Sequence, residues 1–463
     1  MNLSRISVTG FRGIESFSTC LTPGVNVLIG RNGSGKSTLI HAVVKALSFI
    51  FANKLSLGKD FISAGNNTLN VRGFKPSDFH FDRVSKQYAP LAVIDAEASF
   101  SGELFFWEMR QRNNGSSALM SSGYAEAFRK FIAMAMREDA QWPLLAYYSD
   151  SYPHVYNRLP SVTARIIKRE SVPRNYGYYK WDDESACTSL WETRLCDSLL
   201  RFQALNNILI HSMKGSEEEI KCSMLIGPLS REIEYISETL NAFLQELPLL
   251  AEEGYLLAYA MPQRVGSQQR VQLVFRNGER NFLHELPAGY RRLISIVLDL
   301  AYRAFLLNEG APSPHGIAII DEIDLHLHPS LQQHVLQALQ KTFPYLQFIV
   351  STHSAAVIGN LDTTGGENGE ARNSVLIMHP GFSEPEIVPN LVGVDYNAII
   401  RDFMDTPSRN EQISRLKDDY FSFLNLGMKV ESDSVLSRLT RILGENSPAL
   451  REIREKGREY EIH

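Results

Sequence analysis

Short stretches in which apolar and polar residues alternate predict β-strands in the first quarter of the chain. They are residues 3–9, 25–29 and 91–106, the last long enough for one or two strands. Two later stretches, residues 317–320 and 348–350, are apolar throughout, as is typical of parallel strands buried on both faces. Because helical patterns separate these stretches, the chain favours an α/β fold with a mixed β-sheet core.

Helices are predicted where apolar residues recur every three or four positions. The predicted helices cover residues 36–47, 125–136, 190–210, 216–247, 289–307 and 331–339, and most of the chain after Val394. The two long helices between 190 and 247 are expected to form a lid layer inserted into the sheet domain. We therefore expect four parts: an N-terminal lobe (1–150), a mostly helical insertion (151–265), a C-terminal lobe (266–395) and a helical tail (396–463).

A glycine-rich turn joins the strand at 25–29 to the helix at 36–47, and it fits G-x-x-x-x-G-K-[ST] from Gly30 to Ser37. Such a turn lets backbone N–H groups converge on phosphate oxygens, and the helix N-terminus adds its positive dipole. We expect ATP with Mg²⁺ here, Lys36 at the β- and γ-phosphates and the Ser37 hydroxyl on the metal. The expected nucleotide-binding residues of this loop are Asn32, Gly33, Ser34, Gly35, Lys36, Ser37 and Thr38.

Two carboxylates, Asp321 and Glu322, follow the apolar stretch 317–320, which places them at the carboxyl edge of a central strand. Asp321 is expected to hold Mg²⁺, and Glu322 to polarise the attacking water. The alternative is an acidic turn at a strand end without a functional role. The phosphate loop makes this alternative less favoured, because a metal ion bound with the polyphosphate would offset the charge of the two adjacent acids. His353 follows the strand at 348–350 and is expected to contact the γ-phosphate or its water, so the expected catalytic residues are Glu322, Lys36 and His353.

Two further histidines, His326 and His328, follow the acidic pair. No third ligand has suitable spacing for a metal site, so a structural or subunit-contact role is favoured.

Basic and aromatic residues are interleaved between Ser151 and Trp181, a composition that nucleic-acid surfaces use. The alternative is a tyrosine-rich insertion packed on a neighbouring subdomain, and composition by itself favours that alternative. The residues concerned are Arg158, Arg165, Lys168, Arg169, Arg174 and Lys180, with Tyr152, Tyr156, Tyr176, Tyr178, Tyr179 and Trp181.

The net charge of −5 gives no global basic field that would draw the chain onto nucleic acid or an anionic membrane. Four cysteines without a C-x-x-C pair indicate free thiols in a reducing compartment. We expect no signal peptide, because the polar residues Asn2, Ser4 and Arg5 begin a strand pattern. No apolar run approaches the roughly 18 residues that span a bilayer, and we expect a cytoplasmic protein.

The order of GRNGSGKST, LPAGYRRL, IIDEIDLHLHP and STHS resembles the ATP-binding-cassette ATPases found in SMC proteins, RecF and the overcoming-lysogenization-defect nucleases. The resemblance implies a nucleotide-sandwich dimer in which a signature turn faces the γ-phosphate bound by the other subunit. Here that turn is Pro287, Ala288, Gly289 and Tyr290, so the signature serine is replaced by Pro287 and its hydroxyl is missing. The resemblance also implies that Asp324 lies in the D-loop, that His353 is the switch histidine and that Arg12 contacts nucleotide. For Arg12, a solvated loop arginine is the alternative.

A narrower resemblance, to the PtuA-type ATPase subunits of Septu antiphage systems and their retron-associated relatives, covers most of the chain. It is carried by YY after a strand, the run from Arg174 to Tyr179, the GY-R signature, EIDLHLHP and the tail with Leu443-Gly-Glu-Asn. It implies homodimers or larger oligomers that hold a separate HNH nuclease and restrain it while nucleotide is bound.

No TOPRIM acidic cluster and no H-N-H metal site is recognised in the sequence, so the chain is expected to cut nothing by itself. The alternative function is a RecF-like or SMC-like ATPase of DNA repair that binds DNA directly through residues 158–181.

Overall fold

The computed structural model describes residues 1–52, 70–114, 118–137, 140–150, 159–182, 188–266, 268–310, 313–365, 372–381, 383–404 and 411–460. Tyr152, Tyr156, Arg158 and Cys187 therefore lie outside the described residues. The chain divides into two compact units, Met1–Val394 and Asp395–His463.

The N-terminal part of the first unit is a four-stranded antiparallel sheet in the order β2-β1-β6-β7. Its strands are β1 (Asn2–Phe11), β2 (Ile14–Cys20), β6 (Leu91–Phe100) and β7 (Glu103–Arg112). The predicted stretch 91–106 is therefore a hairpin of two ten-residue strands. A two-stranded ribbon lies nearby in sequence, formed by β4 (Phe81–Asp82) and β5 (Gln87–Tyr88).

The central sheet has six strands in the order β15-β14-β3-β13-β12-β8, and all its pairs are parallel except β14 with β15. The strands are β3 (Val25–Ile29), β8 (Leu144–Tyr148), β12 (Gly316–Ile320), β13 (Leu346–Ser351), β14 (Ser374–Ile377) and β15 (Glu386–Ile387). Every residue of β3, β8, β12 and β13 is buried, because helices or the other sheet cover both faces. The alternation predicted for β3 comes from Asn26, which is buried but hydrogen-bonds Thr22 and Ser374.

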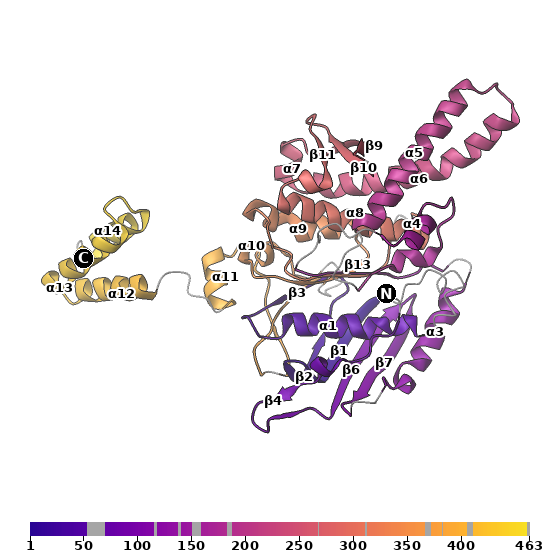
Figure 1. The fold of residues 1–463 in the computed structure, drawn as a ribbon. Coiled ribbons are helices and arrows are strands. Elements are labelled where there is room, and N and C mark those ends of the chain that lie inside the picture. The colour runs from indigo at the N-terminus through magenta and orange to yellow at the C-terminus, as the bar shows by residue number, and fades with distance from the viewer. Residues whose placement is uncertain are drawn as a thin grey trace. The chain divides into compact units, whose positions relative to one another are not determined.

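Helix α1 (Lys36–Leu47) lies between the two sheets, where it contacts β1, β6 and β7 on one side and β13 on the other (Figure 1). Both sides of the helix are apolar, with Leu39, Ile40, Val43 and Leu47 buried. The strand–loop–helix unit β3–α1 is thus fixed in the middle of the molecule.

The second layer of helices contains α8 (Ala288–Asn308), α9 (Pro329–Thr342) and α10 (Ala355–Ile358). The long helices α5 (Thr188–His211) and α6 (Glu217–Gln245) run side by side, and α6 also contacts α8 and α9 (Figure 1). A three-stranded sheet in the order β11-β10-β9 follows α7 (Pro248–Glu252), and its strands are β9 (Leu257–Val265), β10 (Gln268–Phe275) and β11 (Arg280–Phe282). The Asn277-Gly278 turn, a dipeptide typical of two-residue hairpins, joins β10 to β11 in an antiparallel pair.

The other elements of the first unit are short. They are α3 (Ala125–Ala135), α4 (Ser161–Ile167) and the 3-10 helices η1 (Ser48–Phe51), η3 (Pro76–Asp78), η4 (Ser121–Gly123), η5 (Arg174–Tyr178) and η6 (Leu283–Glu285).

The second unit is helical, as predicted, with α11 (Tyr396–Asp402), α12 (Glu411–Asn425), α13 (Lys429–Leu443) and α14 (Pro448–Tyr460). The last three helices enclose a small core of their own, formed by Leu416, Tyr420, Val435, Leu439, Leu450 and Ile453. None of the helices in the described part of either unit is long and apolar enough to cross a bilayer.

Candidate nucleotide site

The predicted catalytic and nucleotide-binding residues follow three neighbouring parallel strands. In the register of the central sheet, Ser351 of β13 pairs with Leu28 of β3, and Val350 pairs with Ile320 of β12. The carboxyl ends of these strands therefore meet at one sheet edge, and the loops that start at Gly30, Asp321 and Thr352 leave from it. Residues almost three hundred positions apart are brought together there, as the sequence predicted, and ligands of open α/β sheets bind at this edge.

The phosphate loop has a backbone that only glycine adopts without strain. Gly30, Gly33 and Gly35 have φ angles of 142°, 82° and 101°. A Cβ added to Gly30 would lie 2.4 Å from the Met378 carbonyl oxygen, so any side chain there would displace the loop. Gly35 is the N-cap of α1 and offers no side-chain cap, which leaves N–H groups of the first turn available to a ligand.

One polar atom of this loop is buried without a protein partner. The Ser34 side-chain oxygen has no hydrogen bond within the described part of the chain, although Ser34 is buried. Buried polar atoms are nearly always satisfied, so this hydroxyl suits a phosphate oxygen. The donor types also fit Mg²⁺, which prefers oxygen ligands: the Ser37 hydroxyl lies in the first turn of α1, and the Asp321 carboxylate lies at the same sheet edge.

Lys36 folds back over the loop that precedes it. Its Nζ donates to the carbonyl oxygens of Gly30 at 2.8 Å and Arg31 at 3.2 Å. Burial lowers the pKa of Lys36, and the negative charges of Asp321 and Glu322 act in the opposite direction. The ammonium group is therefore close enough to the acidic pair to feel its field, which ties the two predicted motifs to one site.

The acidic pair is held by hydrogen bonds to its backbone and to one side chain. The Ser351 hydroxyl donates to Asp321 Oδ1 and accepts from the Glu322 N–H at 2.8 Å. The Asp321 N–H donates to the Tyr148 carbonyl at 2.8 Å. Glu322 itself has a φ of 51°, a left-handed conformation that non-glycine residues rarely adopt. The Asp321 carboxylate and the Glu322 backbone are consequently held by the same serine.

Asp324 organises the segment that carries His353. Its Oδ1 accepts from the Thr352 hydroxyl at 2.5 Å and from the His353 N–H at 3.2 Å. The His353 side chain is exposed at this edge. Asp324 thereby positions the histidine segment within its own chain.

His328 has a structural position. It is the N-cap of α9, where its Nδ1 accepts from the Ser330 N–H at 3.3 Å. His326 is exposed and has a φ of 63°. Among the described residues, no group of three or more His, Cys, Asp or Glu side chains is placed to hold a metal ion.

The signature turn begins α8. Pro287 is the N-cap and offers no side-chain hydrogen bond, and Ala288 opens the helix. A Cβ added to Gly289 would lie 2.6 Å from the His326 carbonyl, so glycine allows α8 to approach the loop after β12. The Tyr290 hydroxyl donates to Glu253 at 3.1 Å, and burial together with this bond raises the pKa of Tyr290 to about 12.

Arg12 lies in the turn between β1 and β2, beside the phosphate loop. A Cβ at Gly35 would lie 3.5 Å from a side-chain carbon of Ile14, the first residue of β2 after that turn. The Arg12 guanidinium is ion-paired with Asp78 at 2.8 Å, and its side chain is one-third exposed. Arg12 is therefore held by protein contacts rather than free in solvent, and its contact with nucleotide stays a prediction.

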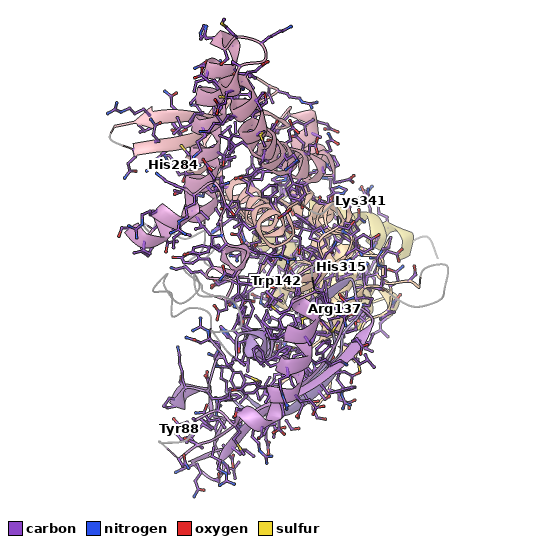
Figure 2. All side chains as sticks on the ribbon, turned by 90° about the vertical axis from the view of Figure 1, so that its right-hand side faces the viewer. Tyr88, Arg137, Trp142, His284, His315 and Lys341 are labelled. Carbon is purple, nitrogen blue, oxygen red and sulfur yellow. The ribbon has the colours of Figure 1, made fainter. Side chains whose placement is uncertain are left out.

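The aromatic residues of the basic and aromatic segment are packed inside the first unit. Tyr176, Tyr178, Tyr179 and Trp181 are all at most 4% exposed. The Tyr178 ring stacks on Trp142, which Figure 2 shows near the middle of the molecule. These four rings cannot stack on bases, so for them the packed alternative is correct.

The described basic residues of that segment differ in their surroundings. Lys180 is half-buried, with its Nζ 6.0 Å from the centroid of the Tyr179 ring. Arg174 hydrogen-bonds Ala140, Leu307 and Asn308, whereas Arg165, Lys168 and Arg169 are exposed at and after the end of α4.

Sequence reasoning missed residues that support the site from neighbouring elements. Ser351 was read only as part of the STHS run, and Tyr148 and Arg292 were given no role. Ser351 had a sequence signal, because it ends a buried strand beside the acidic pair. Arg292 had none, because its partners are backbone carbonyls of distant segments.

The fold and site together define an ABC-type P-loop ATPase head. The family model described as "RecF/RecN/SMC N terminal domain" matches residues 2–368, and the chain belongs to that family.

The chain is also similar to individual proteins, among them the following three. The chain is 27% identical to "Retron Vc95 probable ATPase" of Vibrio cholerae serotype O1 biovar El Tor over 391 residues, covering 77% of this chain and 71% of the relative. A shorter match, 35% identical over 78 residues, is to "Septu protein PtuA" of Bacillus mycoides (strain KBAB4), covering 16% of this chain and 10% of that protein. Among solved structures, an SMC head bound to the C-winged helix domain of ScpA is 16% identical, with a TM-score of 0.42 and coverage of 84% of this chain and 98% of that chain.

Proposed function

We propose that this protein binds and hydrolyses ATP as the regulatory subunit of an antiphage defence complex. The observation that carries the proposal is the meeting of the phosphate loop with Asp321 and Glu322 at one edge of the central sheet. The likeness to proteins named as a retron ATPase and a Septu protein supports the defence context.

The residues have distinct roles in this proposal. The backbone N–H groups from Asn32 to Thr38 and the Ser34 hydroxyl bind phosphate oxygens, and Lys36 leaves its two carbonyl partners for the β- and γ-phosphates. Ser37 and Asp321 hold Mg²⁺, which when bound would supply positive charge to the developing phosphoryl oxygens.

Glu322 orients the attacking water and accepts its proton, and His353 contacts the γ-phosphate. Arg12 adds a contact to nucleotide from the neighbouring turn. The position of each residue at or beside the sheet edge supports these assignments.

Two copies would enclose the nucleotide between them. Pro287, Ala288, Gly289 and Tyr290 of one copy would present the N-terminus of α8 to the phosphates bound by the other. Because Pro287 has no hydroxyl, we expect slower hydrolysis but intact nucleotide-dependent dimerisation. A separate HNH nuclease subunit is proposed as the further partner, restrained while nucleotide is bound and located with this protein in the cytoplasm.

The test is Glu322→Gln. We expect hydrolysis to fall by about 10²–10⁴-fold, the range for losing a general base, while ATP binding is kept and a nucleotide-bound dimer accumulates. Single-turnover hydrolysis and light scattering after size exclusion measure the two effects.

The matched control is Glu126→Gln, which changes an exposed acid in the first turn of α3. If the Glu322 variant stays monomeric with saturating ATP, the sandwich is wrong. If the unaltered protein binds no ATP, the whole proposal is wrong.

A further inference from the structure

One buried arginine on the signature helix contacts the loops of the acidic pair and of the neighbouring strand. Arg292 lies in the second turn of α8 and is 1% exposed. Its guanidinium donates to the backbone carbonyls of Asp150 at 2.7 Å, Ser149 at 3.3 Å, Asp321 at 2.8 Å and Glu322 at 3.2 Å. The carboxyl ends of β8 and β12 are thus joined to α8 through a single side chain.

These bonds fix the backbone of Glu322 from one side, while Ser351 fixes it from the other. The Glu322 N–H donates to the Ser351 hydroxyl at 2.8 Å, and the Glu322 carbonyl accepts from Arg292. The left-handed φ of 51° at Glu322 costs free energy and persists only when surrounding contacts impose it. Arg292 therefore helps to hold the Glu322 backbone, together with Ser351 and with the Leu325 N–H, which donates to the same carbonyl at 3.1 Å.

The same helix carries the turn that would face a partner copy. Gly289 lies three residues before Arg292, a rise of about 4.5 Å along the helix. It also packs closely on the loop after β12, since its added Cβ would lie 2.6 Å from the His326 carbonyl. A shift of α8 would move the guanidinium and, with it, the carbonyls of Asp321 and Glu322.

We propose that Arg292 is a positioning residue for hydrolysis. Arg292 holds the Glu322 backbone of its own subunit in position. Because Arg292 lies on α8, this position also depends on whether the signature turn of α8 contacts the nucleotide bound by a second copy. This inference rests on the proposed ATP hydrolysis. A purely structural role, satisfying buried carbonyls, is the competing explanation.

The experiment compares two buried arginines of α8. Arg292→Lys keeps the charge but cannot reach four carbonyls with its single ammonium group. Arg303→Lys is the matched control: Arg303 is 4% exposed and bonds Asp299, which also accepts from the Tyr148 hydroxyl, and the Gly177 carbonyl, but it bonds neither Asp321 nor Glu322. We expect Arg292→Lys to lower kcat at least about tenfold with KM and ATP affinity within about threefold, and Arg303→Lys to keep kcat within about twofold.

A double variant separates positioning from general stability. If Arg292 acts through Glu322, adding Arg292→Lys to Glu322→Gln should lower single-turnover hydrolysis no further. Additive losses would overturn the inference, and so would an unchanged kcat in Arg292→Lys.

The remaining outcomes are also decisive. If Arg292→Lys and Arg292→Gln both fail to fold while Arg303→Lys folds, the structural explanation holds instead. An unaltered protein that binds ATP without hydrolysing it would refute the role of Arg292 but leave nucleotide binding intact. One that binds no ATP would refute the proposed function itself.

Discussion

Two regions of the first unit invited a functional interpretation from sequence, and they differ in what the structure makes of them. At the edge of the central sheet, the phosphate loop and the acidic pair meet, with Lys36 in the field of Asp321 and Glu322. In the basic and aromatic segment, the rings from Tyr176 to Trp181 are buried and part of the core. The fixed order of residue types between a strand and a helix indicated a nucleotide site. The composition of the basic and aromatic segment did not by itself indicate a nucleic-acid surface.

The physical reason is that a composition rich in aromatic residues is compatible with two different structures. An aromatic ring that can stack on a base is equally suited to a core, where it buries a large apolar surface. Tyr178 shows this, because its ring packs on Phe51 and Trp142 while its hydroxyl donates to the Pro143 carbonyl at 2.7 Å. The phosphate loop is less ambiguous, because it combines positive-φ glycines with a lysine and a serine at a fixed spacing between a strand and a helix.

The comparison predicts the largest loss of stability in the aromatic segment. Tyr178→Ala should lower the free energy of unfolding by about 3–5 kcal/mol, because it removes a ring that is 1% exposed and leaves a cavity. Tryptophan fluorescence during urea unfolding measures it, since the four tryptophans all lie before residue 192 and report on the first unit.

Tyr88→Ala is the control for that change. Tyr88 is 57% exposed on β5, at the lower end of the molecule in Figure 2, and we expect a change within about 0.5 kcal/mol. If Tyr178→Ala were as mild as the control, the segment would not be core, and its rings would again be available to a partner.

Much of the fold could be predicted from the chain itself. The strand at 25–29, the helix after it, the buried strands before the acidic pair and before STHS, and the Asn277-Gly278 hairpin all follow from local pattern. The shared sheet edge follows from them, because parallel strands end on the same side.

The rest depends on contacts between distant segments that leave no local trace. β14, which pairs with β3 in the central sheet, is not among the strands that the sequence pattern predicts. Gln347, polar and fully buried, bonds the backbone of Leu3 and so ties β13 to β1. Arg292 likewise looks like a surface residue of the signature helix until its four carbonyl partners are in place.

At the sheet edge, a smaller effect is expected from Lys36→Met. Charged hydrogen bonds of this kind contribute about 1.5–3 kcal/mol each, so ATP affinity should fall by about 10–100-fold. Isothermal titration with ATP and Mg²⁺ measures the loss. The control is Lys130→Met, which changes a half-buried lysine of α3 that pairs with Glu103 and should bind ATP as the unaltered protein does. Equal affinities in both variants would mean that the loop does not hold the triphosphate.

The smallest effect, on both stability and activity, is expected at the exposed cations of the basic and aromatic segment, Arg165, Lys168 and Arg169. Replacing all three by Gln should leave the free energy of unfolding within about 0.5 kcal/mol, because no side-chain contact of the core is removed. The carbonyls of Lys168 and Arg169, which accept from Arg201 and Arg194, are kept in the variant.

ATP hydrolysis and binding of a fluorescent DNA duplex across a salt series should also be unchanged in this variant, because the neighbouring rings are not available to stack. If these cations contact phosphates instead, the slope of log affinity against log salt would fall by up to about 0.9 per lost charge, and direct DNA binding of the RecF kind would replace our proposal.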